Sequence, residues 1–384
     1  MNRRDFLASA GVAAIASTIP RTAFPSPGKA VHGARAPTHV DFTTDGLGLG
    51  PRDYTALLQD LTARDALTPD GYSNGGVIQA LEQTFARMLG KQAAMFVPTG
   101  TLANHIAVRT LAKGGRVLVQ DRSHFYNDSG DAPQVLSGLN LMPVDMDDAA
   151  LDVGRIEHAL AQSSSGRVRT PVGAISIETP VRRRDHALVD FDVLAKISAL
   201  ARERGIGLHL DGARLFNMPF HSGRSVKQYA ALFDTVYVSL WKNFNGASGA
   251  ILAGDAVVID SLFHVRRMFG GSLPQAWPIV APALHGAERY ESDYANAWKS
   301  ADRVLALLQA DGRFAVRKVA NGTSRFFLKV TGIATDRYAA AARTRDLILP
   351  NAGPDTDEFA LQVNPTWLRM QPDVLARRLI AALG

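Results

Sequence analysis

The sequence predicts an α/β protein with a large domain, built on a mainly parallel sheet covered by helices, and a smaller C-terminal α+β domain. Two observations predict the large domain: short apolar runs typical of buried strands, and stretches with helical apolar spacing between them. Such alternation produces parallel strands with helices on both faces. The third observation is a change near residue 257, beyond which the helical stretches are longer. The composition, 46% hydrophobic and 20% charged, excludes wholesale disorder and collagen-like repeats.

Each predicted element rests on its own apolar pattern. Uninterrupted apolar runs predict buried strands, and apolar side chains three and four residues apart predict helices. The predicted strands are 93–97, 116–119, 172–177, 206–210, 235–239 and 249–252, and the predicted helices are 77–89, 102–111, 151–161, 191–204 and 226–233. In the smaller domain, strands are expected near residues 325–330 and 359–363. Because ligands of such sheets bind at the carboxyl ends of the strands, residues that follow the strands are the candidate site residues.

The first 36 residues resemble a twin-arginine export signal. Arg3 and Arg4 precede a Phe-Leu pair, and a mild apolar stretch runs over residues 6–19. This stretch is too short and too rich in small residues for stable membrane insertion. The resemblance implies a folded protein that the twin-arginine export machinery carries to the periplasm; the alternative is a frayed N-terminus with two incidental arginines. We therefore expect residues 1–36 to be signal and linker, residues 37–256 the large domain and residues 257–384 the small domain.

The charge and the absence of cysteine exclude several classes of protein. The formal net charge is +6, but residues 1–36 hold five basic residues and one acidic residue, which leaves 37 basic and 35 acidic residues in the rest of the chain. A nearly neutral mature chain without a basic motif does not fit a nucleic-acid-binding protein. Without cysteine, disulfides, thiolate metal sites and a cysteine nucleophile are excluded. No metal site is expected.

Two candidate features follow the first two predicted strands. Residues 98–104 read Pro-Thr-Gly-Thr-Leu-Ala-Asn, where Gly100 would let the backbone approach an anion and Thr101 offers a hydroxyl at a helix N-terminus. The structural alternative is an ordinary helix start with a threonine N-cap. His124 follows the strand 116–119 and could lie flat on an aromatic cofactor, although a lone loop histidine is more often a surface or hydrogen-bonded residue.

Two further features follow later strands. Asp211 and Arg214 lie in Leu-His-Leu-Asp-Gly-Ala-Arg, after the strand 206–210. In the functional interpretation Asp211 faces a ring nitrogen and Arg214 binds a substrate carboxylate through its planar fork; the alternative is a structural Asp–Arg pair. Lys242 follows the strand 235–239, between Trp241 and Phe244. It is either a lysine that reaches back to solvent or a desolvated amine that forms a Schiff base.

Together, an anion cradle, a ring stacker, a carboxylate and a lysine 31 residues beyond that carboxylate indicate pyridoxal 5'-phosphate as the cofactor. At these motifs the chain resembles the low-specificity L-threonine aldolases, which belong to the β-eliminating lyase group of fold-type-I pyridoxal phosphate enzymes. The resemblance runs from about residue 41 to 260 and rests on the segment 72–104, on His-Leu-Asp-Gly-Ala-Arg-Leu-Phe-Asn and on Ser-Leu-Trp-Lys. It implies a fold-type-I architecture and a homodimer or homotetramer with sites at subunit boundaries.

The resemblance assigns cofactor roles to five residues. Gly100 and Thr101 would hold the phosphate, and His124 would stack on the pyridine ring and serve as a base. Asp211 would keep the pyridine nitrogen protonated, and Lys242 would carry the cofactor as a Schiff base. Lys242, His124 and Asp211 are therefore the expected catalytic residues.

The same resemblance assigns three residues to the substrate. Arg214 would bind the substrate carboxylate, Thr44 in Phe-Thr-Thr-Asp-Gly would touch the substrate, and Tyr72 lies where the family has a tyrosine near the subunit boundary. The chain departs from the family at 178–181, which read Glu-Thr-Pro-Val in place of Glu-Asn-Thr-His, and at 166–167, where a loop histidine is common. It also departs at residue 243, asparagine in place of glycine, and at 361–365, where a second carboxylate-binding arginine is absent and Arg369 is the nearest one.

These residues predict an aldolase that cleaves a threonine-like β-hydroxy-α-amino acid, a small substrate, to glycine and an aldehyde through a Schiff base on Lys242. The departures leave open another pyridoxal phosphate reaction on amino acids, namely β-elimination, racemisation or transamination. A non-catalytic exported binding protein is the alternative from a different class. Such a protein has no need of a Schiff-base lysine.

Overall fold

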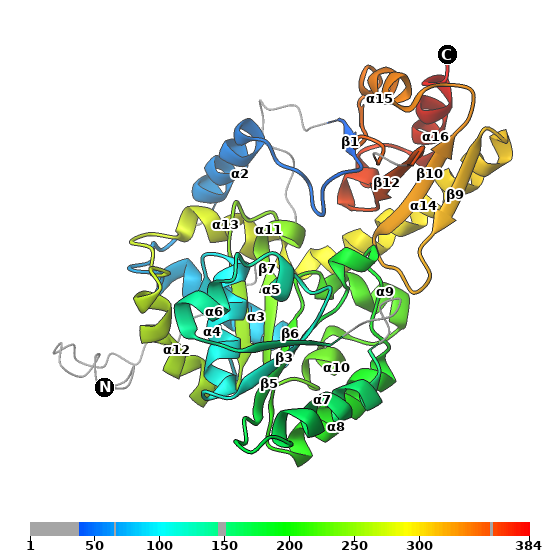
Figure 1. Ribbon diagram of the computed structural model, residues 1–384. Helices are drawn as coiled ribbons and strands as arrows, with labels where there is room; N and C mark the ends of the chain where they lie inside the picture. Colours follow the sequence, from blue (N-terminus) through cyan, green and yellow to red (C-terminus); the bar gives the residue numbers. More distant parts are fainter. Residues whose placement is uncertain (1–37, 65–66, 145–150, 354–355) are drawn as a thin grey trace.

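The computed structural model describes residues 38–64, 67–144, 151–353 and 356–384. The predicted export signal at residues 1–36, with Arg3 and Arg4, lies outside the described residues. The described chain forms a large domain around a seven-stranded sheet and a small domain around a three-stranded antiparallel sheet (Figure 1). None of the helices in the described ranges is both long and apolar enough to cross a membrane.

The seven-stranded sheet has the order β2-β8-β7-β6-β5-β3-β4. Its strands are β2 (Ala93–Val97), β3 (Arg116–Gln120), β4 (Leu141–Val144), β5 (Val172–Glu178), β6 (Gly207–Asp211), β7 (Thr235–Ser239) and β8 (Ala250–Gly254). Neighbouring strands from β4 to β7 run parallel, whereas β8 is antiparallel to both β2 and β7. The prediction of a mainly parallel sheet is confirmed.

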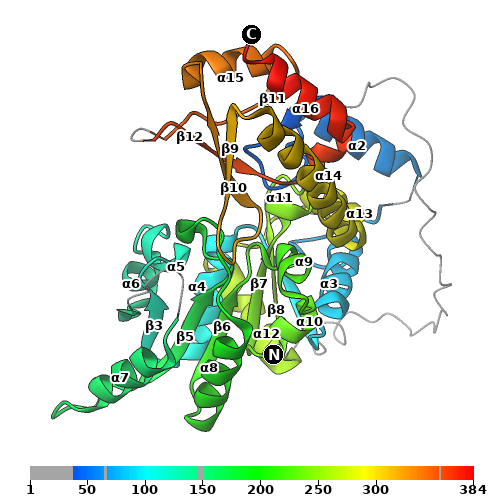
Figure 2. The same ribbon diagram turned by 90° about the vertical axis from the view of Figure 1, so that its right-hand side faces the viewer.

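Helices cover both faces of this sheet because successive side chains of a strand point to opposite sides. In β2, Phe96 packs into the core that contains α3 (Gly76–Leu89), whereas Met95 and Val97 pack with α4 (Gly100–Ala112) and α12 (Ala256–Met268). Figure 2 shows the two layers on either side of the strands. The other helices here are α2 (Pro51–Arg64), α5 (His124–Asn127), α6 (Ala132–Ser137), α7 (Val153–Ser164), α8 (Phe191–Glu203), α9 (Met218–Ser222), α10 (Val226–Ala230), α11 (Leu240–Asn243) and α13 (Trp277–Gly286).

The small domain lies at one end of the central sheet (Figure 2). Its antiparallel sheet has the order β12-β10-β9, and a separate parallel pair joins β1 to β11, with Val40 opposite Leu347. The strands are β1 (Val40–Asp41), β9 (Phe314–Lys318), β10 (Arg325–Val330), β11 (Leu347–Ile348) and β12 (Glu358–Gln362), and the helices are α14 (Tyr290–Asp311), α15 (Thr335–Arg343) and α16 (Pro372–Ala381).

The predicted domain boundary at residue 257 falls inside α12. This helix contacts β2, β8 and α4, and α13 contacts α2 and α3, so both pack on the large domain. By contrast, α14 packs on β9 and α16 of the small domain. The packing partners therefore change between α13 and α14, and the first described strand, β1, pairs with the small domain.

Candidate active site

A pocket opens at the carboxyl edge of the central sheet, and we call it the lysine pocket. Its lining residues lie on strands β5, β6 and β7 or in the turns that follow β3, β5, β6 and β7. They are His124, Glu178, Arg182, Asp211, Ala213, Tyr237 and Lys242. The fold therefore brings together His124, Asp211 and Lys242, the three residues predicted to be catalytic.

Asp211 ends β6 and is held by a buried relay of hydrogen bonds. Asn104 in α4 donates from Nδ2 to Oδ2 of Asp211 at 2.6 Å, and the backbone N–H of Ala213 donates to Oδ1 at 3.2 Å. Oδ1 of Asn104 lies 2.9 Å from Nε2 of His209, and Nδ1 of His209 lies 2.8 Å from Oγ1 of Thr235. Burial lowers the pKa of His209 to about 4, so the neutral ring donates from Nε2 to Asn104. The relay fixes the orientation of the Asp211 carboxylate.

Lys242 follows β7 in the short helix α11, where Ser239 is the N-cap and its Oγ accepts the backbone N–H of Lys242 at 3.4 Å. Lys242 is only 9% exposed. Burial, and then the positive charge of Arg214, lower the pKa of its amine. Among the described residues, no carboxylate lies within salt-bridge distance of Nζ. A buried amine with a lowered pKa and no direct counterion has the properties of a Schiff-base lysine rather than of one that reaches back to solvent.

His124 begins α5 after β3, and Glu178 at the end of β5 fixes its backbone. The carboxylate of Glu178 accepts the backbone N–H of His124 at Oε2, 2.6 Å, and that of Arg182 at Oε1, 2.8 Å. Burial lowers the pKa of His124, so its imidazole is available as a proton acceptor. Burial, and then the charge of Asp211 on the neighbouring strand, raise the pKa of Glu178 to about 7.

Gly100 begins α4, and the absence of a side chain there has a steric reason. A Cβ at this position would collide with the hydroxyl of Tyr237, whose ring also lines the lysine pocket. The N-cap of α4 is Thr99, whose Oγ1 accepts the backbone N–H of Leu102 at 3.2 Å. The threonine that caps this helix is therefore Thr99, and the hydroxyl of Thr101 takes no part in the N-cap.

Arg214 forms a buried pair, but its partner is Asp45 and not Asp211. Nε and Nη2 of Arg214 lie 2.7 and 2.9 Å from the two carboxylate oxygens of Asp45. Both side chains are 7% exposed. Nη1 of Arg214 has no hydrogen-bond partner within the described residues. The predicted role of Arg214 in binding a substrate carboxylate would therefore fall to Nη1, since Asp45 occupies the other edge of the guanidinium.

Asp45 belongs to residues 39–47, which we call the N-terminal strap. Thr44, predicted to touch the substrate, donates its hydroxyl to the backbone oxygen of Gly46 at 3.0 Å and is not among the residues that line the lysine pocket. The small domain holds the strap through side-chain donors. Asn364 donates to the carbonyls of Asp41 and Thr44, at 2.8 and 2.7 Å, and Arg369 donates to those of His39 and Leu47, at 3.1 and 2.7 Å. Arg369, the arginine nearest to the expected second carboxylate-binding position, therefore binds the backbone of the N-terminal strap.

Tyr72 lies outside the lysine pocket of its own chain and is 55% exposed. Its backbone φ is 51°, in a tight turn before α3, and the guanidinium of Arg267 lies 5.2 Å from the centre of its ring. The role predicted for Tyr72 at a subunit boundary stays a prediction.

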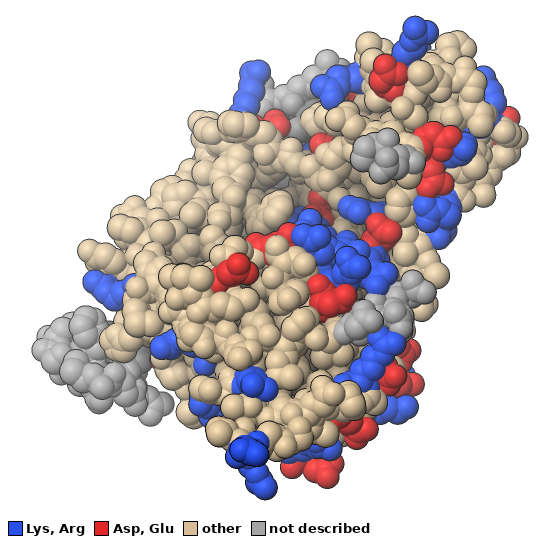
Figure 3. Space-filling model, viewed as in Figure 1, with Lys and Arg blue, Asp and Glu red and all other residues tan. Residues whose placement is uncertain are grey.

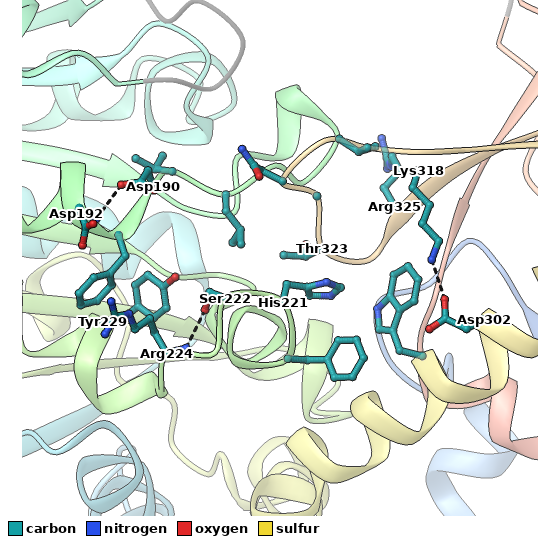
Figure 4. Close-up of a pocket in the computed structure, with 18 residues that line it drawn as sticks. Asp190, Asp192, His221, Ser222, Arg224, Tyr229, Asp302, Lys318, Thr323 and Arg325 are labelled. Carbon is teal, nitrogen blue, oxygen red and sulfur yellow. Dashed lines mark hydrogen bonds and ion pairs between the residues drawn. The ribbon is translucent and has the colours of Figure 1, made fainter.

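A larger pocket lies between the two domains, lined from the large domain by α9 and the start of α8 and from the small domain by α14 and the turn between β9 and β10 (Figure 4). Lys318 and Asp302 form an ion pair at 2.7 Å on its small-domain side. Burial lowers the pKa of His221 to about 4, and Nε2 of His221 lies 3.0 Å from the hydroxyl of Tyr294. None of the predicted site residues lines this pocket.

Sequence reasoning missed five residues that shape the site: Asp45, Asn104, Glu178, Arg182 and Tyr237. A signal existed for two of them. Glu178 directly follows the predicted strand 172–177 just as Asp211 follows the predicted strand 206–210, and Asn104 lies one helical turn after Gly100. For Asp45, no local pattern indicates a partner 169 residues away.

The residues present fit pyridoxal phosphate. A buried amine, a carboxylate held in one orientation by Asn104, and a glycine at a helix N-terminus supply the three groups that this cofactor needs. The sheet is mainly parallel, Asp211 ends β6, and Lys242 follows the neighbouring strand β7. This arrangement defines the fold-type-I class of pyridoxal phosphate enzymes. A profile of the beta-eliminating lyase family matches residues 55–328, and the chain belongs to that family.

Curated relatives of the chain are threonine aldolases. The low specificity L-threonine aldolase of Saccharomyces cerevisiae is 31% identical over 224 residues, which cover 57% of this chain and 55% of the yeast enzyme. A probable low-specificity L-threonine aldolase of Arabidopsis thaliana is 29% identical over 66% of this chain and 72% of that protein. The chain therefore matches about half of the yeast enzyme's length and nearly three quarters of the plant protein's.

Solved structures agree with the fold. A putative L-allo-threonine aldolase from Listeria monocytogenes superposes with a TM-score of 0.70 at 28% identity, over 86% of this chain and 94% of that one. A putative aromatic amino acid beta-eliminating lyase/threonine aldolase from Exiguobacterium gives a TM-score of 0.75 at 24% identity, over 89% and 96%. The second likeness, below 25% identity, concerns the fold alone.

Proposed function

We propose that this chain is a pyridoxal phosphate-dependent aldolase that cleaves a β-hydroxy-α-amino acid such as threonine to glycine and an aldehyde. The observation that carries the proposal is the buried amine of Lys242, with its lowered pKa, in one pocket with the oriented carboxylate of Asp211. Membership of the beta-eliminating lyase family and the threonine aldolases among the relatives support it.

The cofactor would be held by residues of the lysine pocket and by the start of α4, which does not line the pocket but lies against Tyr237. Lys242 would bind it covalently, Asp211 would face its ring nitrogen, His124 would lie on its ring, and Gly100 and Thr101 would offer the N-terminus of α4 to its phosphate. When bound, this cofactor supplies an electron sink for the pair released when the Cα–Cβ bond breaks.

The remaining work falls to groups of the chain itself. His124 is neutral near pH 7 because burial lowers its pKa, so an imidazole nitrogen can take the β-hydroxyl proton. Nη1 of Arg214 would bind the substrate carboxylate while Asp45 keeps the guanidinium plane fixed. Asp211 would face the ring nitrogen with its carboxylate held in one orientation by the side chain of Asn104 and the N–H of Ala213.

The decisive assay separates the aldolase reaction from its rivals by their products. Purified holoenzyme is incubated with threonine, allo-threonine, phenylserine and serine, and aldehyde, glycine, ammonia and keto acid are measured. The proposal expects aldehyde and glycine in equal amounts. Ammonia with a keto acid would instead indicate β-elimination, and an absence of any product from all four substrates would contradict an aldolase.

We also propose that the chain reaches the periplasm by the twin-arginine route. Arg3 and Arg4 before Phe-Leu, followed by a short apolar stretch, support this assignment. Changing both arginines to lysine should leave the protein in the cytoplasm of a bacterial host that carries the export machinery. Unchanged recovery from the periplasm would contradict the proposal.

For the assembly, we propose a homodimer or homotetramer. The exposed ring of Tyr72, in a fixed turn outside its own chain's lysine pocket, supports a boundary at this turn. Light scattering should give at least twice the 41.3 kDa of one chain. A fully active monomer would contradict the proposal.

A further inference from the structure

Arg182 is a cation in the lysine pocket that none of the roles above uses. It begins the 3₁₀ turn Arg182–Arg184 after β5, directly beyond the segment where the chain departs from the Glu-Asn-Thr-His pattern. Arg182 lines the pocket with His124 and Lys242, and after burial its positive charge is one of the causes that lower the pKa of His124. Its Nε is buried without a hydrogen-bond partner in the described residues, while the side chain as a whole is 40% exposed.

Two carboxylates fix Arg182 relative to the rest of the pocket. Glu178 accepts the backbone N–H groups of both His124 and Arg182, so the turns after β3 and β5 are joined at one carboxylate. Asp128, just beyond α5, accepts Nη2 of Arg182 at 2.6 Å. Arg182 is therefore a preorganised part of the pocket wall.

The carboxylate that binds the guanidinium of Arg182 is not its partner alone. Asp128 is shared with Arg183, whose Nη2 lies 2.7 Å from its other oxygen, and these arginines lower the pKa of Asp128 to about 2. Asp128 is thus divided between two guanidinium groups and neutralises Arg182 only in part. Figure 3 shows basic side chains gathered beside acidic ones near the centre of the face on view. A partly desolvated guanidinium that is neutralised only in part attracts an anionic group of a bound molecule.

We propose that Arg182 makes the lysine pocket selective for β-hydroxy-α-amino acids whose side chain carries a second carboxylate, of which β-hydroxyaspartate is the smallest. This inference rests on the proposed aldolase function. The α-carboxylate goes to Nη1 of Arg214, and the side-chain carboxylate goes to the Nη1 edge of Arg182, because Asp128 binds Nη2 and Nε is buried. The methyl group of threonine leaves that edge without a partner.

The cleavage needs no further reactant. The Cα–Cβ bond breaks, the β-hydroxyl hydrogen leaves as a proton, and the electron pair of its O–H bond becomes the second carbon–oxygen bond of the aldehyde. The pair from the broken bond ends in a C–H bond at Cα when a proton is taken up. β-Hydroxyaspartate therefore gives glycine and glyoxylate.

The test compares kcat/KM for β-hydroxyaspartate and for threonine in the wild-type holoenzyme and in two variants. We expect the wild type to favour β-hydroxyaspartate by about tenfold or more, the range of one charge-assisted hydrogen bond at a partly exposed site. Arg182→Gln should reduce this ratio about tenfold, chiefly through KM for β-hydroxyaspartate. Arg183 binds the same Asp128 but does not line the pocket, so Arg183→Gln should keep the ratio within about threefold of the wild type.

A second measurement uses the wild type alone, in case Arg182→Gln does not fold. Malate should inhibit threonine cleavage about tenfold more tightly than lactate, which lacks the second carboxylate. Two results would overturn this inference and leave the proposed aldolase function intact. In the first, the wild type cleaves threonine but prefers neither β-hydroxyaspartate over threonine nor malate over lactate. In the second, the ratio of kcat/KM values falls equally in both variants. A wild type that cleaves neither amino acid would overturn the proposed function and this inference with it.

Discussion

Asp45 and Arg214 lie 169 residues apart and form a two-point ion pair in which both side chains are 93% buried, with Nε–Oδ1 and Nη2–Oδ2 distances of 2.7 and 2.9 Å. Asp45 lies on the N-terminal strap, which Asn364 and Arg369 of the small domain hold by its carbonyls. The arginine predicted to bind the substrate is therefore oriented by a segment anchored on the other domain. A displacement of the small domain would move Asp45 and, with it, the guanidinium.

Asp45→Asn should weaken both the fold and substrate binding. The change removes the counter-charge of a buried guanidinium, and breaking a buried ion pair costs about 3–5 kcal/mol in free energy of unfolding. The KM for the amino acid should also rise, by about tenfold, because the orientation of Arg214 is lost. Denaturant titration and steady-state kinetics measure the two effects. Asp373→Asn breaks the exposed pair with Arg303 and should change neither; equal results for the two variants would contradict a special role for Asp45.

Asn104→Ala should reduce turnover without abolishing folding. The change leaves an oxygen of Asp211 and the Nε2–H of His209 without their buried partner, and each such group costs about 1–3 kcal/mol. We expect kcat and cofactor affinity each to fall by roughly 5- to 150-fold, measured by kinetics and by cofactor titration. Ser137→Ala is the control, because it removes the contact of Ser137 with His105, which lies on α4 as Asn104 does. Similar losses in both variants would contradict the relay.

Glu178 should make the stability of the cofactor-free protein depend on pH. Its pKa is raised from the ordinary 4.5 to about 7, so its stabilising contribution is complete below pH 4.5 and is lost as the pH rises toward 7. Glutamine does not ionise. The melting temperature of Glu178→Gln minus that of the wild type should therefore increase between pH 5 and pH 8, whatever its value at pH 5. A difference that is constant or that decreases with pH would contradict the raised pKa.

Gly100→Ala should impair cofactor binding because the new methyl group would collide with the Tyr237 hydroxyl at the start of α4. Overpacking of this kind costs about 1–3 kcal/mol, which corresponds to a roughly 5- to 150-fold weaker affinity if the strain falls on the cofactor site. Cofactor titration followed by absorbance measures it. Gly286→Ala is the matched control, because a Cβ there meets its nearest atoms at 3.6 Å. Unchanged affinity in Gly100→Ala would contradict the role of this turn.

The regular elements could largely be predicted from the sequence. Strands β2, β7 and β10 have the predicted bounds, because each is a short run, either mostly apolar or alternating between buried and less buried residues, that ends at a turn. The edge strand β4 was not predicted, since Pro143 interrupts it and three of its four residues are not fully buried. Helix α10 ends at Ala230, three residues before its predicted end at residue 233.

The site could be predicted only in part. Parallel strands bring their carboxyl ends to one edge, so Asp211 and Lys242 were predictable from their places after strands. The side chains that orient the site residues could not be predicted, because these partners lie far along the chain. Asn104 is 107 residues from Asp211, and Asp45 is 169 residues from Arg214. Apolar periodicity carries no information about such pairs.

The central claim is that Lys242 is the residue that binds the cofactor, and one measurement tests it most directly. The purified holoenzyme is reduced with borohydride, digested, and its peptides are mapped by mass spectrometry. We expect the reduced cofactor on the peptide that contains Lys242, and no label in Lys242→Ala, because the buried amine with its lowered pKa is the nucleophile of the lysine pocket. Label on a different lysine, or a wild-type protein that takes up no cofactor, would contradict the account.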